Sequence, residues 1–332
     1  MFQFQASVPP TPGDANVNGK TIIVTGANSG LGFEAVRQFV LLGASRVILA
    51  CRSLSRGQEA VVALRSDPEI EAHNASVVFD VFELDLNDYQ SGLRFSKRVK
   101  EEVKELDILL NNGGISLLQW RKSESGHEQT MQVNCYTHIL ICLELFPLLR
   151  KTAAIRGSPT RITFVGSATQ LKQETMSRAS IPPPDSILGY FDKKSTFSIF
   201  RYADSKLAVS AYTRRLAQLS PSEVIVNNLC PGLVQTGLDK NLPGVLRVLM
   251  GFVRKSAART VQEGGRTLIH AAVVASAETN GKFLRNNKIE PAAAFLETTE
   301  GEVFIDRLWR ETLQDVCVVD PELRSFTQEV GA

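Results

Sequence analysis

Thr25–Gly32 reads TGANSGLG, and this stretch decides the expected fold. It follows a short β-branched run, Thr21–Thr25 (TIIVT), and precedes Phe33–Leu42, whose apolar residues have helical spacing. The three glycines permit a tight turn and let the backbone approach a pyrophosphate, and the first amides of the helix face that anion. The spacing is GxxxGxG rather than GxGxxG, so the expected phosphate loop is one turn longer. A strand, a glycine-rich turn and a helix in this order predict a dinucleotide site, the alternative being a turn that binds no ligand.

Apolar runs alternate with helical patterns along the rest of the chain. Strands are expected at Thr21–Thr25, Arg46–Ala50, Ser76–Leu84, Asp107–Leu110, Arg161–Val165, Val224–Leu229 and Gly281–Leu284. Helices are expected at Phe33–Leu42, Gly57–Ser66, Tyr89–Leu106, Gly126–Leu149, Tyr202–Leu219 and Gly301–Val316. Strands that alternate with helices need crossover connections, which produce a parallel sheet covered on both faces. We therefore predict an α/β fold built as a single domain over residues 19–332.

Composition and charge limit the partners of this domain. The chain has 43% hydrophobic and 22% charged residues, as in ordinary soluble globular proteins. A net charge of +2 predicts no basic field for nucleic acid or for a membrane surface. No apolar run approaches the roughly 18 residues that span a bilayer, and the N-terminus lacks the pattern of a signal peptide. We therefore expect a cytoplasmic enzyme with no membrane span. The prolines and glycine near the N-terminus predict a flexible arm over residues 1–18.

Cysteine and histidine spacing does not indicate a metal site. The chain has five cysteines (Cys51, Cys135, Cys142, Cys230 and Cys317) without CxxC spacing. Its four histidines (His73, His127, His138 and His270) show no HxxxH or HExxH pattern. An odd number of scattered cysteines also argues against a closed disulfide framework. We expect buried free thiols in a reducing compartment, and histidines that are solvated or packed in the core.

Charged residues after two expected strands indicate the cofactor. Arg52 ends the second strand in the run ACRS. At this point an acidic residue binds the ribose 2′-hydroxyl of NAD, whereas an arginine suits the 2′-phosphate of NADP. Arg52 therefore predicts NADP(H), and Arg56 adds to the same positive patch; the alternative is a surface arginine at a strand end. Asp85, after the third strand, is placed to meet an adenine amino group, or it serves only as a loop cap.

A phenol and an ammonium lie one helical turn apart in YADSK, Tyr202–Lys206. A separation of four residues places both on one face of a helix. A free phenol has a pKa of about 10, and an adjacent ammonium favours the phenolate and lowers that pKa. Tyr202 is therefore the expected acid–base and Lys206 its partner. A second YxxxK pair, Tyr190 and Lys194, lies among turn-forming and β-branched residues with little helical pattern, so we reject it.

Together with further motifs, these two runs resemble the short-chain dehydrogenase/reductase family. The motifs, in that family's order, are TGANSGLG, Leu84-Asp85-Leu86, NNGG at Asn111–Gly114, Asn134, Ser167, YADSK and PGLVQT at Pro231–Thr236. The resemblance covers Lys20 to Leu284 and implies a doubly wound parallel sheet (Rossmann fold) with extended substrate loops. The ACRS run and the C-terminal extension, 285–332, are similar to the retinol-dehydrogenase-like branch and to fungal reductases of secondary metabolism.

The resemblance also implies a catalytic tetrad of Asn134, Ser167, Tyr202 and Lys206. Tyr202 would protonate the forming alkoxide and Ser167 would hydrogen-bond to the same oxygen. Lys206 would also hold the nicotinamide ribose, and Asn134 would keep a water beside the lysine for proton relay. The expected contacts to NADP(H) are Gly26, Asn28, Ser29, Gly30, Leu31, Gly32, Arg52, Asp85, Leu86, Asn112, Gly113, Tyr202, Lys206, Pro231, Gly232, Val234 and Thr236.

Two features depart from the family pattern. Gly113 stands where the family has alanine, a change for which we expect little chemical effect. The gap from Ser167 to Tyr202 is unusually long, and we expect segments 168–201 and 237–257 to form the substrate pocket. Their apolar residues are Leu188, Tyr190, Phe191, Phe197, Phe200, Leu238, Leu242, Leu246, Leu249, Met250 and Phe252. This lining predicts a sizeable apolar ketone or secondary alcohol as substrate. The alternative is that these residues pack on each other or on a second subunit.

The favoured activity is NADP(H)-dependent reduction of a ketone, or oxidation of the matching secondary alcohol. The alternative is a non-redox isomerase or cyclase, or a nucleotide-sensing protein, on the same scaffold. The resemblance further implies a homodimer or homotetramer formed through the helices around Gly126–Leu149 and Tyr202–Leu219.

Overall fold

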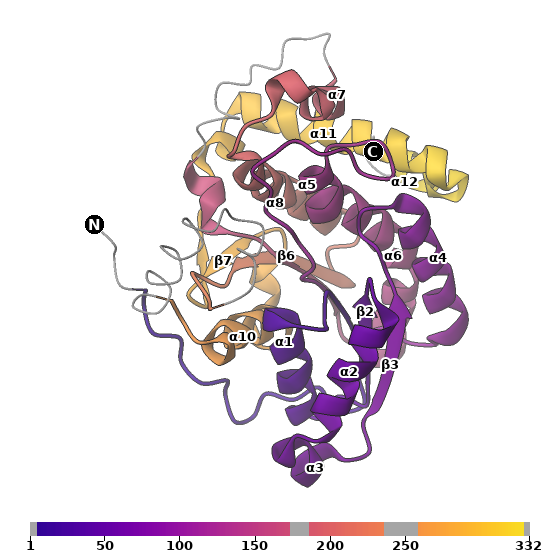
Figure 1. Cartoon of the computed structure of the whole chain (residues 1–332), viewed down its shortest axis with the longest axis vertical. Helices are drawn as coiled ribbons and strands as arrows, with labels where there is room; N and C mark the ends of the chain where they lie inside the picture. The colour runs from indigo at the N-terminus through magenta and orange to yellow at the C-terminus, as the bar shows by residue number, and fades with distance from the viewer. Residues whose placement is uncertain (1–4, 173–185, 236–257, 329–332) are drawn as a thin grey trace.

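The computed structural model describes residues 5–172, 186–235 and 258–328, and within them one sheet organises the chain (Figure 1). Its strand order is β3-β2-β1-β4-β5-β6-β7-β8. The strands are β1 (Thr21–Thr25), β2 (Arg46–Cys51), β3 (Val78–Glu83), β4 (Ile108–Asn111), β5 (Thr160–Val165), β6 (Val224–Cys230), β7 (Phe283–Arg285) and β8 (Lys288–Glu290). Neighbouring strands are parallel except for the antiparallel pair β7–β8. The predicted α/β fold with a parallel sheet is therefore confirmed.

Helices cover both faces of the sheet (Figure 1). They are α1 (Gly30–Leu41), α2 (Leu54–Arg65), α3 (Pro68–Asn74), α4 (Tyr89–Glu102), α5 (Gln129–Met131), α6 (Thr137–Arg156), α7 (Ile187–Asp192), α8 (Arg201–Leu219), α10 (Val261–Ile269), α11 (Thr299–Val319) and α12 (Ser325–Gln328). Successive side chains of a strand point to opposite faces. Ile22 therefore belongs to the core that includes α1, α2 and α10, whereas Ile23 belongs to the core that includes α4, α6, α8 and α11. These two cores explain why Ile22, Ile23 and Val24 form a continuous apolar run in β1.

The order of the strands fixes where a ligand binds. β1 lies between β2 and β4, because the chain builds outward to β3 and then returns to the other side of β1. In doubly wound sheets, ligands bind at the carboxyl ends of the strands, at the point where the strand order reverses. The glycine-rich turn after β1 and the NNGG run after β4 meet at this point.

The long helical stretch expected at Gly126–Leu149 begins and ends later in the structure, from Gln129 to Arg156, and it is interrupted by a π-helical turn. Helix α5 leads through a π-helical turn, Gln132–Tyr136, into α6, which continues to Arg156. Gly157, with φ of 62°, follows as a left-handed cap. The π turn contains Asn134, and such turns are common at functional sites.

Five described helices and strands lie outside the expected pattern: α3, α7, α10, α12 and β8. Two of them carry start signals in the sequence. Asp67 caps α3 and is followed by Pro68, and α10 begins with a capping box in which Thr260 and Glu263 exchange hydrogen bonds. The rejected pair Tyr190 and Lys194 is split by the end of α7, so the two side chains do not share a helical face.

Residues 5–18 do not form the free arm that the sequence suggests. Val8 and Val17 are buried, and the Gln5 side chain bonds to the backbone of Leu233. The arm runs along α10 and α1 on its way to β1 (Figure 1). The apolar side chains among its prolines supply the contacts that hold it. Residues 1–4 lie outside the described part of the chain.

The C-terminal extension covers the helices through which an oligomer was expected. Tyr212 Oη on α8 and Thr312 Oγ1 on α11 are 2.6 Å apart. Phe146 of α6 packs edge-on against Phe326 of α12, with ring centroids 6.1 Å apart. These faces of α6 and α8 are therefore covered by the same chain.

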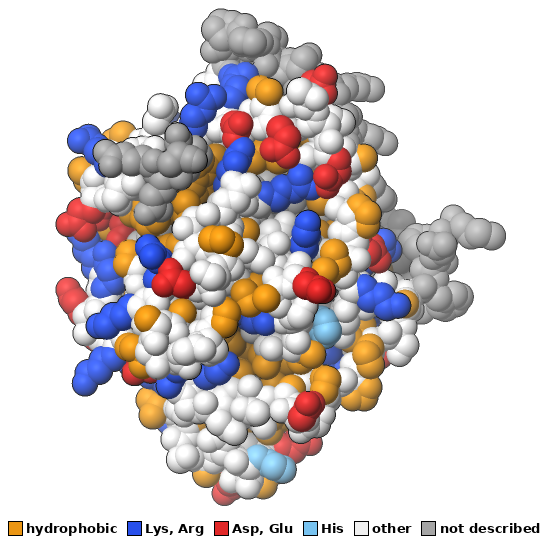
Figure 2. All heavy atoms as spheres, turned by 180° about the vertical axis from the view of Figure 1, so that it is seen from behind, with side chains coloured by type: hydrophobic (Ala, Val, Ile, Leu, Met, Phe, Trp, Pro, Cys, Tyr) orange, Lys and Arg blue, Asp and Glu red, His pale blue; other side chains and the backbone are white. Residues whose placement is uncertain are grey.

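The surface shows no segregation of charge on the face drawn in Figure 2, where basic and acidic side chains are interspersed. Among the described residues, no helix is both long and apolar enough to cross a bilayer. The described residues also contain no group of three or more His, Cys, Asp or Glu side chains suited to a metal ion.

Candidate active site

The glycine-rich turn has the conformation that its sequence requires. Gly26 and Gly30 have φ of 64° and 57°, which other residues rarely adopt. A Cβ on Gly32 would overlap the carbonyl oxygen of Gly26 and the Asn112 side chain. The turn therefore closes tightly on the start of α1, leaving helix-terminal amides at the carboxyl edge of the sheet.

A cavity of about 280 Å³ opens beside this turn. It is lined by Gly26, Asn28, Ala50, Arg52, Ser53, Arg56, Leu84, Asp85, Leu86, Asn87, Gly113, Gly114, Ile115, Gln129 and Val133. Six of the predicted cofactor residues thus meet in one place: Gly26, Asn28, Arg52, Asp85, Leu86 and Gly113. Arg52 and Arg56 are both exposed, and neither has an ion-pair partner among the described residues. Asp85 uses Oδ1 to accept the amide of Asn87 at 3.0 Å, so it caps the loop while its other oxygen stays available to a ligand.

Asn112 does not line this cavity. Its Nδ2 donates to the carbonyl oxygen of Thr25 at 2.8 Å. Thr25 Oγ1 in turn accepts the amides of Asn112 and Gly113, at 3.0 and 2.9 Å. These bonds join the ends of β1 and β4, so Asn112 supports the glycine-rich turn without lining the cavity.

His138 completes this support, a role that the sequence reasoning missed. Its Nε2 lies 3.2 Å from Thr25 Oγ1. Because that hydroxyl already accepts two amides, its own hydrogen points to Nε2, which requires the neutral ring. Burial lowers the pKa of His138 to about 3, consistent with a neutral imidazole. His138 stands one helical turn after Asn134. That spacing in the sequence could have indicated that His138 lies on the same side of the helix as Asn134.

The extra glycine of the NNGG run has a packing explanation. A Cβ on Gly113 would meet Leu86 Cδ1 at 2.5 Å. The Leu86 side chain therefore occupies the space that an alanine methyl group would need. Gly114, the next residue, faces Asn134 and Lys206: a Cβ there would lie 3.1 Å from Asn134 Oδ1 and 3.8 Å from Lys206 Nζ. Its missing side chain leaves the space between those two groups open.

Tyr202 and Lys206 lie together on α8, as their spacing predicts. Lys206 Nζ is 5.5 Å from the centroid of the Tyr202 ring and donates to the carbonyl oxygen of Val165 at 2.7 Å. Val165 ends β5, so the ammonium is fixed at the carboxyl edge of the sheet. Lys206 is only 5% exposed, and burial lowers its pKa to about 8.

Asn134 is held in one orientation by three hydrogen bonds. Its Oδ1 accepts the amide of Ile115 at 2.8 Å, and its Nδ2 donates to the Ile115 carbonyl and to Ser205 Oγ, both at 2.9 Å. Ser205 Oγ in turn donates to the carbonyl oxygen of Tyr202 at 2.8 Å. The π turn, the loop after β4 and α8 are therefore fixed together.

Ser167 follows β5 two residues after Val165. Its Oγ accepts hydrogen bonds from the amide and the hydroxyl of Thr169, at 3.2 and 3.0 Å. A hydroxyl that accepts two bonds keeps its own hydrogen for a further acceptor.

The loop after β6 approaches the same edge of the sheet. Gly232 has φ of 84°, and Val234 is buried and pairs with Arg259 as an isolated parallel bridge. Arg259 Nη1 donates to the carbonyl oxygen of Pro231 at 2.9 Å. Thr236, also predicted to contact the cofactor, lies outside the described residues.

Comparisons with known proteins agree with this geometry. The family model described as short chain dehydrogenase matches residues 20–179. The short chain dehydrogenase sor7 of Hypocrea jecorina is 64% identical over 291 residues, which cover 87% of this chain and 81% of that protein.

The chain belongs to the short-chain dehydrogenase family.

Two further comparisons are consistent with this membership. The short chain dehydrogenase macD of Penicillium terrestre is 40% identical over 314 residues, covering 94% of this chain and 95% of macD. The Pseudomonas aeruginosa RhlG/NADP active-site complex has 23% sequence identity and a TM-score of 0.61, covering 81% of this chain and 95% of RhlG. At that identity the second likeness concerns the fold alone.

The segment before α8 of this short-chain dehydrogenase differs from the expected pocket wall. Leu188 and Phe191 on α7 are buried in the core rather than facing a pocket. Helix α7 lies against α11, where Glu311 accepts hydrogen bonds from Ser186 Oγ and the Leu188 amide. The C-terminal extension thus supplies apolar surface that takes up these side chains. The second expected wall, 237–257, lies outside the described residues.

Arg201 is a supporting residue that the sequence reasoning missed. Its side chain is buried and donates to the carbonyl oxygens of Phe191 and Thr196, at 3.1 and 2.8 Å. Its guanidinium also lies over the ring of Phe191, 4.7 Å from the centroid. Arg201 therefore ties the segment after α7 to the helix that carries Tyr202.

Proposed function

We propose that this short-chain dehydrogenase is an NADP(H)-dependent enzyme that reduces a ketone, or oxidises the matching secondary alcohol, on a sizeable apolar substrate. The observation that carries the proposal is the buried Lys206 ammonium 5.5 Å from the Tyr202 ring, at the sheet edge that holds the glycine-rich turn. The left-handed glycines and the tight approach at Gly32 suit a pyrophosphate, so the site fits a dinucleotide. When bound, the nicotinamide cofactor supplies or accepts the hydride.

Tyr202 acts as the acid in ketone reduction and gives its phenolic proton to the substrate oxygen. The Lys206 ammonium favours the resulting phenolate, because opposite charges attract strongly where water is excluded. With a pKa of about 8, Lys206 keeps its proton at neutral pH. Its bond to the Val165 carbonyl fixes the charge beside the phenol.

Ser167 stabilises the developing negative charge on the same oxygen. Both bonds from Thr169 are accepted by Ser167 Oγ, which leaves the serine hydrogen for the substrate. Asn134 and Lys206 flank the open space beside Gly114. We propose that this space holds the water through which Tyr202 regains its proton.

The preference for NADP(H) rests on Arg52 and Arg56. Both line the cavity next to the glycine-rich turn, and neither forms an ion pair with a carboxylate of the described residues. A 2′-phosphate would make charge-assisted hydrogen bonds with these guanidinium groups. RhlG, a structural neighbour of this fold, is named as a complex with NADP.

An apolar substrate is favoured by side chains that precede α8. Ile199 and Phe200 are 61% and 46% exposed, and they stand directly before the helix of Tyr202. Exposed apolar residues beside a catalytic group are a natural entrance for a hydrophobic ligand.

We also propose a cytoplasmic location for the enzyme. All five cysteines are buried free thiols, which suits a reducing compartment such as the cytoplasm. A homodimer or homotetramer would need surfaces other than the parts of α6 and α8 that α11 and α12 cover.

The test is a panel of apolar ketones with NADPH, read as loss of the nicotinamide absorbance, using wild type and Tyr202→Phe. The Phe variant keeps the ring and removes the acidic proton. We expect turnover with at least one ketone and its loss in the variant. Equal activity of both proteins would exclude Tyr202 as the acid. An isomerase, cyclase or sensor would bind NADPH without oxidising it with any ketone.

A further inference from the structure

The N-terminal segment is bound to the loop after β6 by an unusual pair of hydrogen bonds. Gln5 Nε2 donates to the carbonyl oxygen of Leu233 at 2.9 Å, and the Leu233 amide donates to Gln5 Oε1 at 2.7 Å. A side-chain amide thus satisfies both backbone groups of one residue, as a neighbouring strand would. The two partners are 228 positions apart in the sequence, so this is a tertiary contact.

Arg259 joins the same loop to two other parts of the chain. Its side chain is buried, and it donates to the carbonyl oxygens of Pro231 and Ala6, at 2.9 and 2.6 Å. Nη2 also donates to Asn286 Oδ1 at 2.5 Å. A planar guanidinium can serve three acceptors in fixed directions, which a lysine ammonium on a flexible stem cannot do as well.

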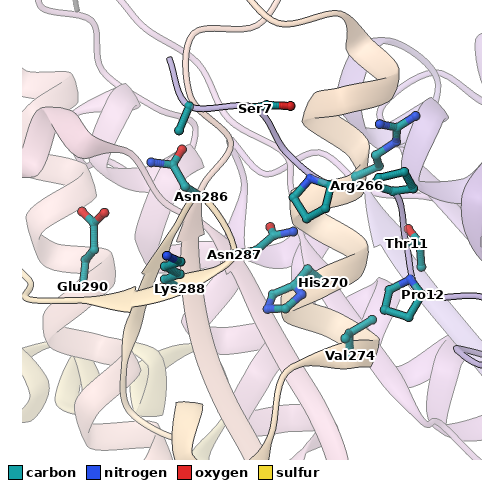
Figure 3. A pocket seen from close by; sticks show the side chains of 13 residues that line it. Ser7, Thr11, Pro12, Arg266, His270, Val274, Asn286, Asn287, Lys288 and Glu290 are labelled. Carbon is teal, nitrogen blue, oxygen red and sulfur yellow. The ribbon is translucent and has the colours of Figure 1, made fainter. Parts of the chain in front are cut away.

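The hairpin that receives Arg259 has a conformation specified by its sequence. Asn286 and Asn287 connect β7 to β8 with φ of 52° and 62°, values that asparagine tolerates better than most residues. Figure 3 shows Asn286 close to Ser7 of the arm, at the rim of a second cavity of about 590 Å³. The arm, the hairpin and the loop after β6 therefore converge on the Arg259 guanidinium.

The backbone of Arg259 also pairs with the backbone of this loop. The Arg259 amide donates to the Leu233 carbonyl at 2.9 Å, and the Gln235 amide donates to the Arg259 carbonyl at 3.1 Å. In an extended segment, successive peptide groups point to opposite edges. The groups of Leu233 consequently face Gln5 and Arg259, while those of Val234 face the other way.

Gly232 allows this close approach. Its φ of 84° is left-handed, and a Cβ there would overlap Gln5 Oε1 and lie 2.8 Å from Arg259 Nη1. The glycine thus makes room for both side chains against the loop. This is a requirement separate from the bend that Pro231 provides.

We propose that Gln5 and Arg259 form an N-terminal latch that positions the loop Pro231–Gln235 for the nicotinamide end of the cofactor. The inference rests on the proposed function, in which this loop contacts the nicotinamide carboxamide. Both are positioning residues, because they touch the loop rather than the cofactor. The latch acts on one end of the cofactor only, since Arg52 and the glycine-rich turn lie at the other end.

This asymmetry gives a direct test by calorimetric titration with two ligands, NADPH and adenosine 2′,5′-bisphosphate, which lacks the nicotinamide half. The variants are Gln5→Ala and Arg259→Lys, with Ser7→Ala as the control on the same arm. We expect the two latch variants to bind NADPH about ten-fold more weakly, because an effect of this size matches the loss of one or two net hydrogen bonds. Their affinity for the bisphosphate, and both affinities of the control, should equal those of wild type.

Three other outcomes would overturn the inference. Wild-type affinity for NADPH in Gln5→Ala would show that the arm does not position the loop. Equal weakening for both ligands would indicate general loosening of the fold rather than a latch. Wild-type protein that binds neither ligand would overturn the proposed function itself, which distinguishes that failure from failure of the latch. Gln5 is only partly buried, so the Gln5→Ala result stands even if Arg259→Lys does not fold.

Discussion

Asn134 Nδ2 donates to Ser205 Oγ at 2.9 Å, which links the π-helical turn directly to the helix of Tyr202 and Lys206. Ser205 Oγ passes its own hydrogen to the Tyr202 carbonyl at 2.8 Å. The serine between tyrosine and lysine in YADSK therefore connects the Asn134 side chain to the Tyr202 backbone. An apolar residue at this position would keep the helix but leave a buried amide donor with one partner fewer.

Ser205→Ala should lower kcat for ketone reduction about ten-fold, because Asn134 would lose the hydrogen bond that positions it. A ten-fold change corresponds to an activation barrier that is higher by roughly 1 to 1.5 kcal/mol. The affinity for NADPH should change little, because Ser205 does not line the cofactor cavity. Steady-state kinetics with a titration of NADPH checks both values. Ser210→Ala on the same helix is the control. Unchanged kcat would mean that Asn134 does not need this bond.

Replacing Arg52 should change the choice of cofactor. Arg52→Asp removes a cation from the cavity and repels a 2′-phosphate, so KM for NADPH should rise at least about ten-fold. The KM for NADH should fall or stay the same, because NADH has no such phosphate. Lys97→Asp on α4 makes the same charge change outside the cavity and serves as the control. If KM for NADPH is unaltered, the assignment of NADP(H) is wrong.

The rate of ketone reduction should fall as the pH rises through about 8. Burial lowers the pKa of Lys206 to about 8, so the ammonium loses its proton there. The phenolate of Tyr202 then loses its stabilising charge. A pH–rate profile between pH 6 and 10 measures this limb, which should move to higher pH in Lys206→Arg. A wild-type rate that stays constant to pH 10 would refute the role of the lysine charge.

Stability should also depend on pH through His127. Its two ring nitrogens lie 2.9 Å from Asp192 and 3.0 Å from Asp315. Burial lowers the pKa of His127, but the hydrogen bonds and charges of the two carboxylates outweigh it and raise the pKa to about 9. Because the folded pKa exceeds the unfolded value, the contribution is complete below about pH 6.5 and disappears as the pH rises through about 9.

Urea unfolding at pH 6 and pH 9.5 measures this loss, which we expect to be roughly 1 to 3 kcal/mol, because the partly exposed aspartates weaken the interaction. His127→Gln cannot carry the charge, so its stability should change much less between the two pH values. A wild-type protein as stable at pH 9.5 as at pH 6 would contradict the assignment.

The sequence predicts the fold and the placement of Tyr202 beside Lys206 because both depend on local spacing. TGANSGLG sets the turn between β1 and α1, and YADSK sets one face of α8, so neither needs knowledge of distant contacts. Helix α10 and helix α3 were missed although their caps are visible as Thr260–Glu263 and Asp67–Pro68.

Other features depend on contacts between distant segments and have no local signal. Leu188 and Phe191 were assigned to a pocket, yet they are buried because α11 lies against α7. Arg201 and Arg259 look like ordinary surface residues in the sequence. In the fold, the Arg259 side chain donates to the backbone carbonyls of Pro231 and Ala6 and to the Asn286 side chain, which belong to three distant segments. Such residues become interpretable only when the tertiary partners are known.

The central claim is that Tyr202 donates the proton that completes ketone reduction. Its most direct test is a single-turnover measurement with enzyme-bound NADPH and a reducible ketone, comparing wild type with Tyr202→Phe after titration shows equal NADPH affinity. We predict that the variant oxidises bound NADPH at least about a thousand-fold more slowly. A variant that binds NADPH normally and oxidises it at the wild-type rate would contradict the proposed mechanism.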